Sequence, residues 1–164
     1  KRILETKSSS FACDLLKWLQ IMKAYEAGGH AYHATMPTDA LARFHESMKE
    51  MEAYGFARLS QAQRELGSRV RTLLAKHGFL SVAAPGFEAP GVVVCFTDDE
   101  AIHKGGAFGK VGLQSAAGVP LACDEGEGFK SFRLGLFGLD KLQNIDRTVA
   151  ELEKALLKIT ASKT

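Results

Sequence analysis

Apolar residues recur at helical spacing in four stretches of the chain. They are Phe11, Leu15, Leu16, Trp18, Leu19 and Met22, then Leu41, Phe44, Met48 and Met51, then Leu66, Val70, Leu73 and Leu74, and finally Ile145, Val149, Leu152, Leu156 and Ile159. Residues three or four positions apart lie on the same face of an α-helix. The pattern therefore predicts four amphipathic helices, three in the first half of the chain and one at its end.

Residues that favour helix ends lie between these stripes. Thr38 or Asp39 can cap the second helix, and Gly55 can end it. Ser60 and Gln63 have the spacing of a capping box, in which a hydroxyl and an amide side chain satisfy backbone N–H groups of the first turn. We therefore expect the third helix to begin near Ser60.

The second half also contains short stretches with strand patterns. The predicted strands span residues 80–83, 91–96, 111–113, 120–122 and 131–137, and a short helix is predicted over residues 99–104. In the last strand, Phe132 and Leu134 fall on one face and Arg133 on the other, because successive side chains of a strand alternate. The order of elements predicts an α+β-like topology, with an antiparallel or mixed sheet and helices on one face.

Composition and charge exclude some classes of protein. The 164 residues are 46% hydrophobic and 24% charged, as in a globular domain. The net charge is +2 and no basic run stands out, so we expect no nucleic-acid partner. No apolar run approaches the roughly 20 residues that a membrane-spanning helix needs, so we expect no membrane association.

The cysteines and the first residue bear on the compartment and on the extent of the chain. Cys13, Cys95 and Cys123 are odd in number and form no Cys-x-x-Cys pair, which disfavours a disulfide framework or a zinc site. We therefore expect a reducing compartment, the cytoplasm. Because the sequence begins at Lys1 and not at Met, we expect a fragment, a processed chain or a trimmed protein.

Arg133 is the first candidate for binding chemistry. It lies in mid-strand opposite the apolar face, where a guanidinium needs a partner because an unpaired buried charge is costly. One interpretation is a structural salt bridge with a carboxylate elsewhere in the protein. The other is a bidentate contact with a ligand carboxylate, which matches the planar fork of arginine. The spacing alone leaves both interpretations open.

The loop before the second helix is the other candidate. Tyr32 and Thr35 place two hydroxyls just before a helix start, where anions such as phosphate are favoured. The alternative is that Tyr32 only packs, and that Thr35 or Thr38 only caps the helix. His30 and His33 have no carboxylate at ligand spacing, so we predict no metal site.

Two segments resemble sequence patterns of the class V aminotransferases, which are fold-type I pyridoxal-phosphate enzymes. Tyr32-His-Ala-Thr-Met-Pro37 is similar to the pattern Y-H-x-T-x-P, and Phe132-Arg-Leu-Gly-Leu-Phe-Gly138 is similar to the later pattern R-x-G-x-x-G. The resemblance covers residues 5–160 in the family's order. It is greatest to the alanine–glyoxylate and serine–glyoxylate aminotransferases.

The resemblance implies a fold, a cofactor and roles for particular residues. Residues 1–37 would be the tail of the large cofactor-binding domain of an α/β enzyme. Residues 38–164 would be its small C-terminal domain, an α+β-like sandwich of two or three layers with a long linking helix. Arg133 would bind the α-carboxylate of the amino-acid or 2-oxo-acid substrate. Tyr32 and Thr35 would reach the phosphate of pyridoxal 5'-phosphate from the neighbouring subunit of a homodimer.

The resemblance also implies what lies outside this chain. The Schiff-base lysine of such enzymes is upstream of the similar segments, and none of Lys1, Lys7 or Lys17 has a matching context. We therefore expect no catalytic residue in this chain and no transamination by the chain alone. In the whole enzyme, an amino group would pass between a small amino acid and a 2-oxo acid such as glyoxylate or pyruvate.

Two other functions stay open from the sequence. One is a non-catalytic α+β module for dimerisation or regulation, which would bind no cofactor phosphate. The other is a different pyridoxal-phosphate reaction on the same fold, such as that of a lyase or a desulfurase. A desulfurase carries a cysteine on a mobile loop, and Cys123 is the candidate for it, although its flanking residues do not match that motif.

Overall fold

The computed structural model describes residues 1–33, 35 and 37–161. Its elements are α1 Arg2–Glu5, α2 Leu15–Glu26, α3 Thr38–Tyr54, α4 Phe56–Lys76, β1 Val92–Phe96, α5 Glu100–His103, α6 Gly106–Lys110, β2 Ala116–Ala117, β3 Ser131–Gly135, α7 Leu139–Gln143 and α8 Ile145–Ala161. None of the helices in the described part of the chain is long and apolar enough to cross a membrane.

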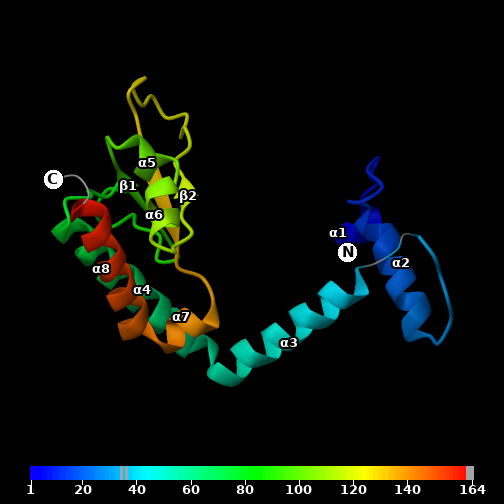
Figure 1. Ribbon diagram of the computed structural model, residues 1–164. Coiled ribbons are helices and arrows are strands. Elements are labelled where there is room, and N and C mark those ends of the chain that lie inside the picture. The colour runs from blue at the N-terminus through cyan, green and yellow to red at the C-terminus, as the bar shows by residue number, and fades with distance from the viewer. Residues whose placement is uncertain (34, 36, 162–164) are drawn as a thin grey trace. The chain divides into compact units, whose positions relative to one another are not determined.

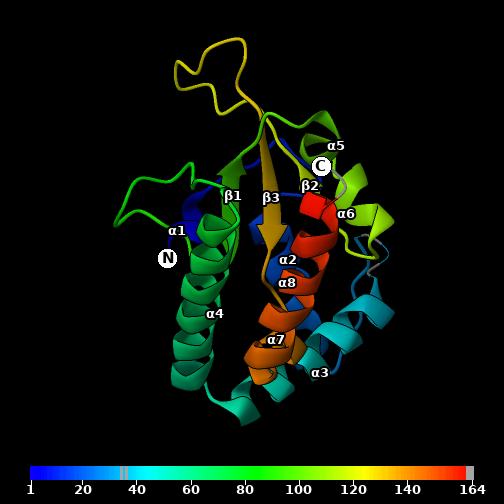
Figure 2. The same ribbon diagram turned by 60° about the vertical axis from the view of Figure 1, so that its left-hand side comes forward.

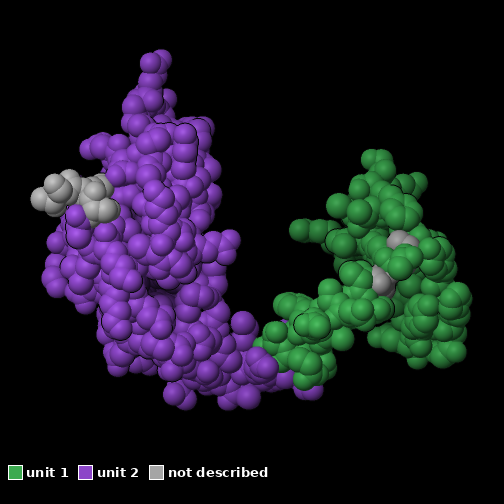
Figure 3. All heavy atoms as spheres, viewed as in Figure 1, with its two compact units in different colours: residues 1–47 green, residues 48–164 purple. Residues whose placement is uncertain are grey.

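The chain divides into two compact units, residues 1–47 and residues 48–164, which Figure 3 shows in different colours. The division lies inside α3. The domain boundary predicted between residues 37 and 38 lies at the start of that helix and stays a prediction.

The first unit contains α1, α2 and the first part of α3. α2 begins at Leu15, later than Phe11, the first residue of the predicted stripe, because the Asp14 carboxylate accepts a hydrogen bond from the Lys17 amide at 3.0 Å and so caps the first turn. Ile21 is buried, whereas Leu15 and Met22 are exposed. Much of the apolar stripe of α2 therefore lies at the surface.

α3 confirms the second predicted helix. It runs from Thr38 to Tyr54, so that Thr38 and Asp39 form its first turn, and Gly55 follows with a φ of 95°. Glycine adopts a positive φ without steric cost, which lets Gly55 end α3 and lead directly into α4. The apolar stripe of α3 is exposed along its length: Leu41, Phe44, Met48 and Met51.

The second unit is built on a three-stranded antiparallel sheet with the order β1-β3-β2. β3 is the central strand, and its Arg133 lies opposite Val94 of β1 and Ala116 of β2. α4 and α8 lie side by side across one face of the sheet, as Figure 1 and Figure 2 show. This arrangement confirms the predicted α+β fold with helices on one face.

The hydrophobic core lies between the sheet and these helices. Its fully buried side chains come from six elements and are Leu66, Val70, Leu74, Val93, Cys95, Ile102, Phe108, Phe132 and Leu156. The ring of Phe132 lies against those of Phe79 and Phe108, with centroid distances of 5.2 and 5.4 Å. The apolar faces that the sequence predicts for the third and fourth helices and for the last strand are therefore the buried faces.

Two residues of α4 hold the loop before β1 against the helix. A Cβ on Gly67 would lie 2.6 Å from the Pro90 carbonyl oxygen, so this close approach requires glycine. Arg71 donates hydrogen bonds to the carbonyl oxygens of Ala89 and Val92, at 2.8 and 3.0 Å. The Arg71 guanidinium thereby fixes the start of β1, with which β3 pairs.

α4 begins earlier than the capping-box motif predicts. It starts at Phe56, and Ser60 lies in its second turn. Gly55 already supplies the break, and Leu59 packs against the core from the first turn of α4. The S-x-x-Q motif therefore lies within a helix whose start is set by glycine geometry and by packing.

The short strands are predicted less well. Residues 80–83 contribute a single bridge, between Ser81 and Cys95, in place of a strand. In the described chain no strand forms over residues 111–113 or 120–122, and β2 lies between them. α6 and α7 have no counterpart in the predicted elements. α6 forms on a glycine-rich sequence because its Phe108 is completely buried in the core.

Candidate functional site

Arg133 lies in the middle of the central strand, with its side chain on the face opposite the core. Its neighbours Phe132 and Leu134 are buried against the helices, whereas Arg133 is half-buried. The strand alternation predicted from the sequence is therefore confirmed. The guanidinium is held on a rigid element, as a residue that must orient a ligand requires.

The Arg133 guanidinium is anchored on one edge only. Its Nε–H donates a hydrogen bond to the Ala117 carbonyl oxygen at 2.9 Å. Within residues 1–33, 35 and 37–161, no carboxylate lies within ion-pair distance of Arg133, and its two Nη atoms donate no hydrogen bond. The interpretation of Arg133 as half of a structural salt bridge thus finds no carboxylate partner in this part of the chain. The fork of two Nη groups has the geometry that binds a carboxylate at both oxygens.

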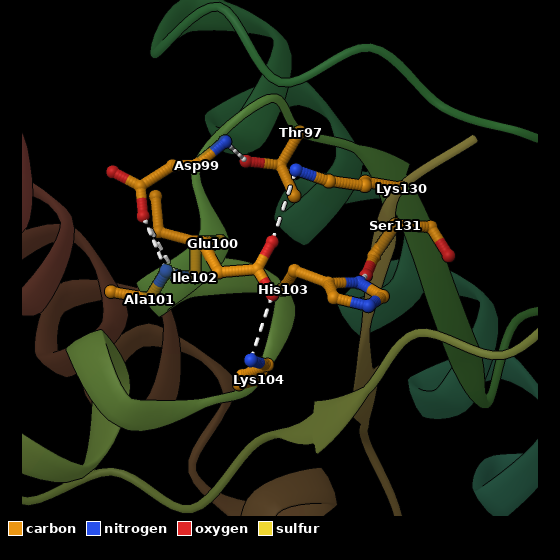
Figure 4. Close-up of polar contacts among 9 residues, drawn as sticks. All are labelled: Thr97, Asp99, Glu100, Ala101, Ile102, His103, Lys104, Lys130 and Ser131. Carbon is orange, nitrogen blue, oxygen red and sulfur yellow. Dashed lines mark hydrogen bonds and ion pairs between the residues drawn. The ribbon is translucent and has the colours of Figure 1, made fainter. Parts of the chain in front are cut away.

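One residue of α5, His103, contacts both the first residue of β3 and the residue that follows β2. Figure 4 shows the His103 ring beside Ser131, and its Nδ1 lies 2.7 Å from the Ser131 carbonyl oxygen. The His103 carbonyl oxygen accepts a hydrogen bond from the Gly118 amide at 3.2 Å. A Cβ on Gly118 would collide with the Ser131 carbonyl oxygen, so glycine is needed there. Sequence patterns do not reveal these contacts, because a two-residue strand shows no alternation.

An ion-pair cluster fastens α5 to the start of β3. Figure 4 shows Glu100 between two ammonium groups, with Lys104 at 2.8 Å and Lys130 at 3.0 Å. The hydrogen bond from Lys104, and then that from Lys130, lower the pKa of the Glu100 carboxyl to about 2. Asp99 caps the helix by accepting hydrogen bonds from the amides of Ala101 and Ile102.

We expect Glu100→Gln to destabilise the protein at neutral pH and to lose this effect in acid. A carboxyl whose pKa is lower in the folded state stabilises the fold above its ordinary pKa of 4.5, and this contribution disappears as the pH falls through about 2. Urea unfolding followed by circular dichroism between pH 7 and pH 2 measures the difference between variant and wild type. Glu127→Gln, at an exposed position, is the control and should show no such convergence. A difference that stays constant over this range would contradict the prediction.

Tyr32 and Thr35 lie together in the first unit. Their hydroxyl oxygens are 3.5 Å apart, and Tyr32 has 72% of its surface accessible. Ala34 and Met36 of the same motif lie outside the described residues. Two adjacent exposed hydroxyls shortly before the start of α3 can donate to a phosphate group, the role that the family resemblance implies for them, which stays a prediction.

The histidines of this loop contact aromatic rings. The ring of His33 lies 4.2 Å from that of Phe11 and 5.1 Å from that of Trp18, and its Nε2 lies 3.4 Å from the Phe11 carbonyl oxygen. His30 lies edge-on to Tyr25. In the described residues, no three His, Cys, Asp or Glu side chains are grouped so that they could hold a metal ion.

Cys123 lies in a loop that is organised by one carboxylate. Glu125 accepts hydrogen bonds from the amides of Cys123, Ala122 and Leu121. The bond from Cys123, then that from its own amide and that from Ala122, lower the pKa of its carboxyl to about 2. Desolvation and then the nearby Glu125 raise the pKa of the Cys123 thiol. A nucleophilic cysteine requires a lowered pKa, so this environment does not favour a desulfurase role.

A pocket of about 570 Å³ lies elsewhere in the second unit, between the start of α4 and the turn from α7 to α8. Its arginines already have partners. Arg69 pairs with Asp146 at 2.7 Å, and the Arg58 guanidinium lies 4.3 Å from the centre of the Tyr54 ring. None of the predicted site residues lines this pocket.

Comparisons with protein families and with curated proteins find no match. Among solved structures, the chain is similar to the alanine–glyoxylate aminotransferase from Nostoc sp., with a TM-score of 0.65 and 18% sequence identity. The similarity covers 92% of this chain and 39% of that chain. At this identity the likeness shows the fold alone. The chain therefore has an aminotransferase-like fold.

Proposed function

We propose that this chain is the C-terminal part of a class V pyridoxal-phosphate-dependent aminotransferase. Its reaction would transfer an amino group between a small amino acid and a 2-oxo acid such as glyoxylate or pyruvate. The observation that carries the proposal is the Arg133 guanidinium, which is fixed by Ala117 and has no carboxylate partner in the described residues. The aminotransferase-like fold supports it, as does the position of Arg133 within the R-x-G-x-x-G pattern.

Arg133 would bind the carboxylate of the substrate. Its Nε–H is engaged by the Ala117 carbonyl oxygen, so the edge formed by the two Nη groups is the one that would bind the ligand. Both the amino acid and the 2-oxo acid carry a carboxylate next to the reacting carbon. One clamp can therefore orient either substrate, and such positioning supplies much of the rate of a two-substrate reaction.

Tyr32 and Thr35 fit a cofactor phosphate. Their hydroxyls are adjacent and exposed, and we propose that they donate hydrogen bonds to it from the neighbouring subunit of a homodimer. When bound, pyridoxal phosphate supplies the electron sink for reactions at the α-carbon of amino acids. The lysine that holds this cofactor is proposed to lie outside the present chain, which spans 39% of the length of the similar aminotransferase.

The test is a transamination assay on the whole protein that contains this chain. We expect bound cofactor, seen by its yellow absorbance, and amino transfer from small amino acids to glyoxylate or pyruvate. The 164-residue chain alone should not catalyse this transfer. A whole protein that binds no pyridoxal phosphate would favour the non-catalytic module instead, whereas bound cofactor with lyase activity alone would favour the other reaction class.

The cysteines support a reducing compartment, and we propose the cytoplasm. In the described residues, Cys13, Cys95 and Cys123 form no disulfide. Cys95 is buried in β1, and its burial raises the pKa of its thiol to about 11. Cys13 and Cys123 are exposed thiols, which persist where disulfides are reduced.

We expect Tyr32→Phe to weaken cofactor binding by roughly tenfold to hundredfold. The change removes one hydroxyl donor, and a hydrogen bond to a charged group contributes about 1.5–3 kcal/mol. Titration of the whole protein with pyridoxal phosphate, followed by absorbance, gives the dissociation constant. Tyr25→Phe removes a hydroxyl from α2 and is the matched control, with no expected change. Equal affinities for both variants would remove Tyr32 from the phosphate site.

A further inference from the structure

His103 makes contact with β3 and with the residue that follows β2, the two strands next to the Arg133 guanidinium. Its side chain reaches the Ser131 carbonyl oxygen, two residues before Arg133 on β3. Its backbone carbonyl oxygen accepts the Gly118 amide, one residue after Ala117 on β2. Ala117 in turn accepts the Nε–H of Arg133. His103 is therefore linked to the Arg133 guanidinium in two ways. One runs through Gly118 and Ala117, and the other runs through Ser131 along β3.

β2 needs such support because it is very short. It consists of Ala116 and Ala117, both exposed, and so has no side chain anchored in the core. The position of the Ala117 carbonyl oxygen therefore depends on its pairing with β3 and on the contact between Gly118 and His103. A shift of β2 would release the Nε–H of Arg133 and leave the fork free to rotate.

We propose that His103 is the positioning residue for Arg133, and that it sets the angle at which the guanidinium meets the substrate carboxylate. This role rests on the proposed function of Arg133. A carbonyl oxygen can only accept a hydrogen bond, so Nδ1 of His103 must carry the hydrogen in this arrangement. His103 itself touches neither substrate nor cofactor in this role.

The kinetic test compares three variants of the whole protein. His103→Leu removes the donor, and His103→Asn keeps one, because the asparagine amide nitrogen can take the place of Nδ1. Lys110→Met changes an exposed lysine at the end of the neighbouring helix α6, outside the Glu100 cluster, and is the control. We expect His103→Leu to raise KM for the amino acid about tenfold with little change in kcat, as loss of ground-state orientation does. His103→Asn should restore KM, and cofactor affinity should be equal in all three.

A second measurement uses the whole protein without cofactor or substrate. In nitrogen-15 NMR spectra, the Nε–H of Arg133 should exchange slowly with water in wild type and at least about tenfold faster in His103→Leu. The variant loses the Nδ1 bond that holds α5 to β3, so the backbone carbonyl of residue 103 no longer fixes Gly118, and the neighbouring Ala117 bond to Arg133 weakens. The signals of His103 should show hydrogen on Nδ1. If His103→Leu does not fold, this wild-type measurement decides: hydrogen on Nε2 alone overturns the proposal, and hydrogen on Nδ1 with slow Arg133 exchange supports it.

The outcomes separate the two proposals. If Arg133→Ala leaves KM for the amino acid unchanged, the proposed carboxylate-binding function of Arg133 is overturned, and the positioning role with it. If Arg133→Ala raises KM and a folded His103→Leu changes neither KM nor the Arg133 exchange, only the positioning role is overturned. A His103→Asn variant that folds but behaves like His103→Leu would equally overturn it.

Discussion

Under the proposed function, replacing Arg133 by alanine should lower kcat/KM for the amino-acid substrate by about thirty-fold to several-thousand-fold in the whole protein. Truncating one partner of a buried, hydrogen-bonded charge pair costs about 2–5 kcal/mol, and each 1.4 kcal/mol corresponds to about tenfold. Both substrates carry a carboxylate at the same place, so kcat/KM for the 2-oxo acid should fall in parallel. Steady-state kinetics with each substrate varied in turn measures both effects.

Two further variants sharpen this result. Arg133→Lys keeps the charge but cannot offer the planar fork, so its kcat/KM should stay well below that of wild type. Arg64→Ala removes an exposed arginine of α4 and should change nothing. If Arg133→Ala, like Arg64→Ala, keeps the kcat/KM of wild type, Arg133 binds no substrate carboxylate. If both variants lose kcat/KM to the same extent, the loss reflects a general effect of charge.

The placement of Arg133 follows directly from the sequence. Alternation from Phe132 to Leu136 predicts which face of the strand is apolar, and the core buries that face. The same holds for α4, where Leu66, Val70 and Leu74 are completely buried. These patterns succeed because one continuous core covers one face of each element, so that burial and sequence period coincide.

The surroundings of Arg133 could not be predicted in this way. The Ala117 carbonyl oxygen and the Gly118 amide are backbone groups, and their partners depend on how three distant segments meet. His103 lies in a predicted helix, but nothing in its spacing points to Ser131, 28 residues further along the chain. Long-range backbone contacts leave no local period in a sequence, so only the folded structure identifies them.

The phosphate loop shows a different limit. Tyr32 and Thr35 are three residues apart, and their proximity in the structure needs only a turn. Their assignment to a phosphate depends on the family pattern, because two neighbouring hydroxyls also occur where threonine merely caps a helix. Sequence spacing predicts that these groups meet, whereas only binding measurements can identify the ligand that they hold.

Phe132→Ala should produce the largest loss of stability, about 3–5 kcal/mol in the free energy of unfolding. The Phe132 side chain is completely buried and lies against Phe79 and Phe108, so alanine would leave a cavity between the sheet and the helices. The single tryptophan, Trp18, is not one of the side chains of this core. Urea unfolding should therefore be followed by circular dichroism and by amide exchange of β1 and β3.

The matched control is Phe87→Ala, which removes the same ring from a side chain with 84% of its surface accessible. Its effect should stay within about 0.5 kcal/mol, as for other exposed positions. The contrast between the two variants isolates burial from side-chain chemistry. Phe132 precedes Arg133 on β3. The kcat/KM of a folded Phe132→Ala variant therefore also tells whether the position of the Arg133 guanidinium depends on core packing or on β2 alone. Similar losses of stability for Phe132→Ala and Phe87→Ala would mean that the core does not lie between the sheet and the helix layer.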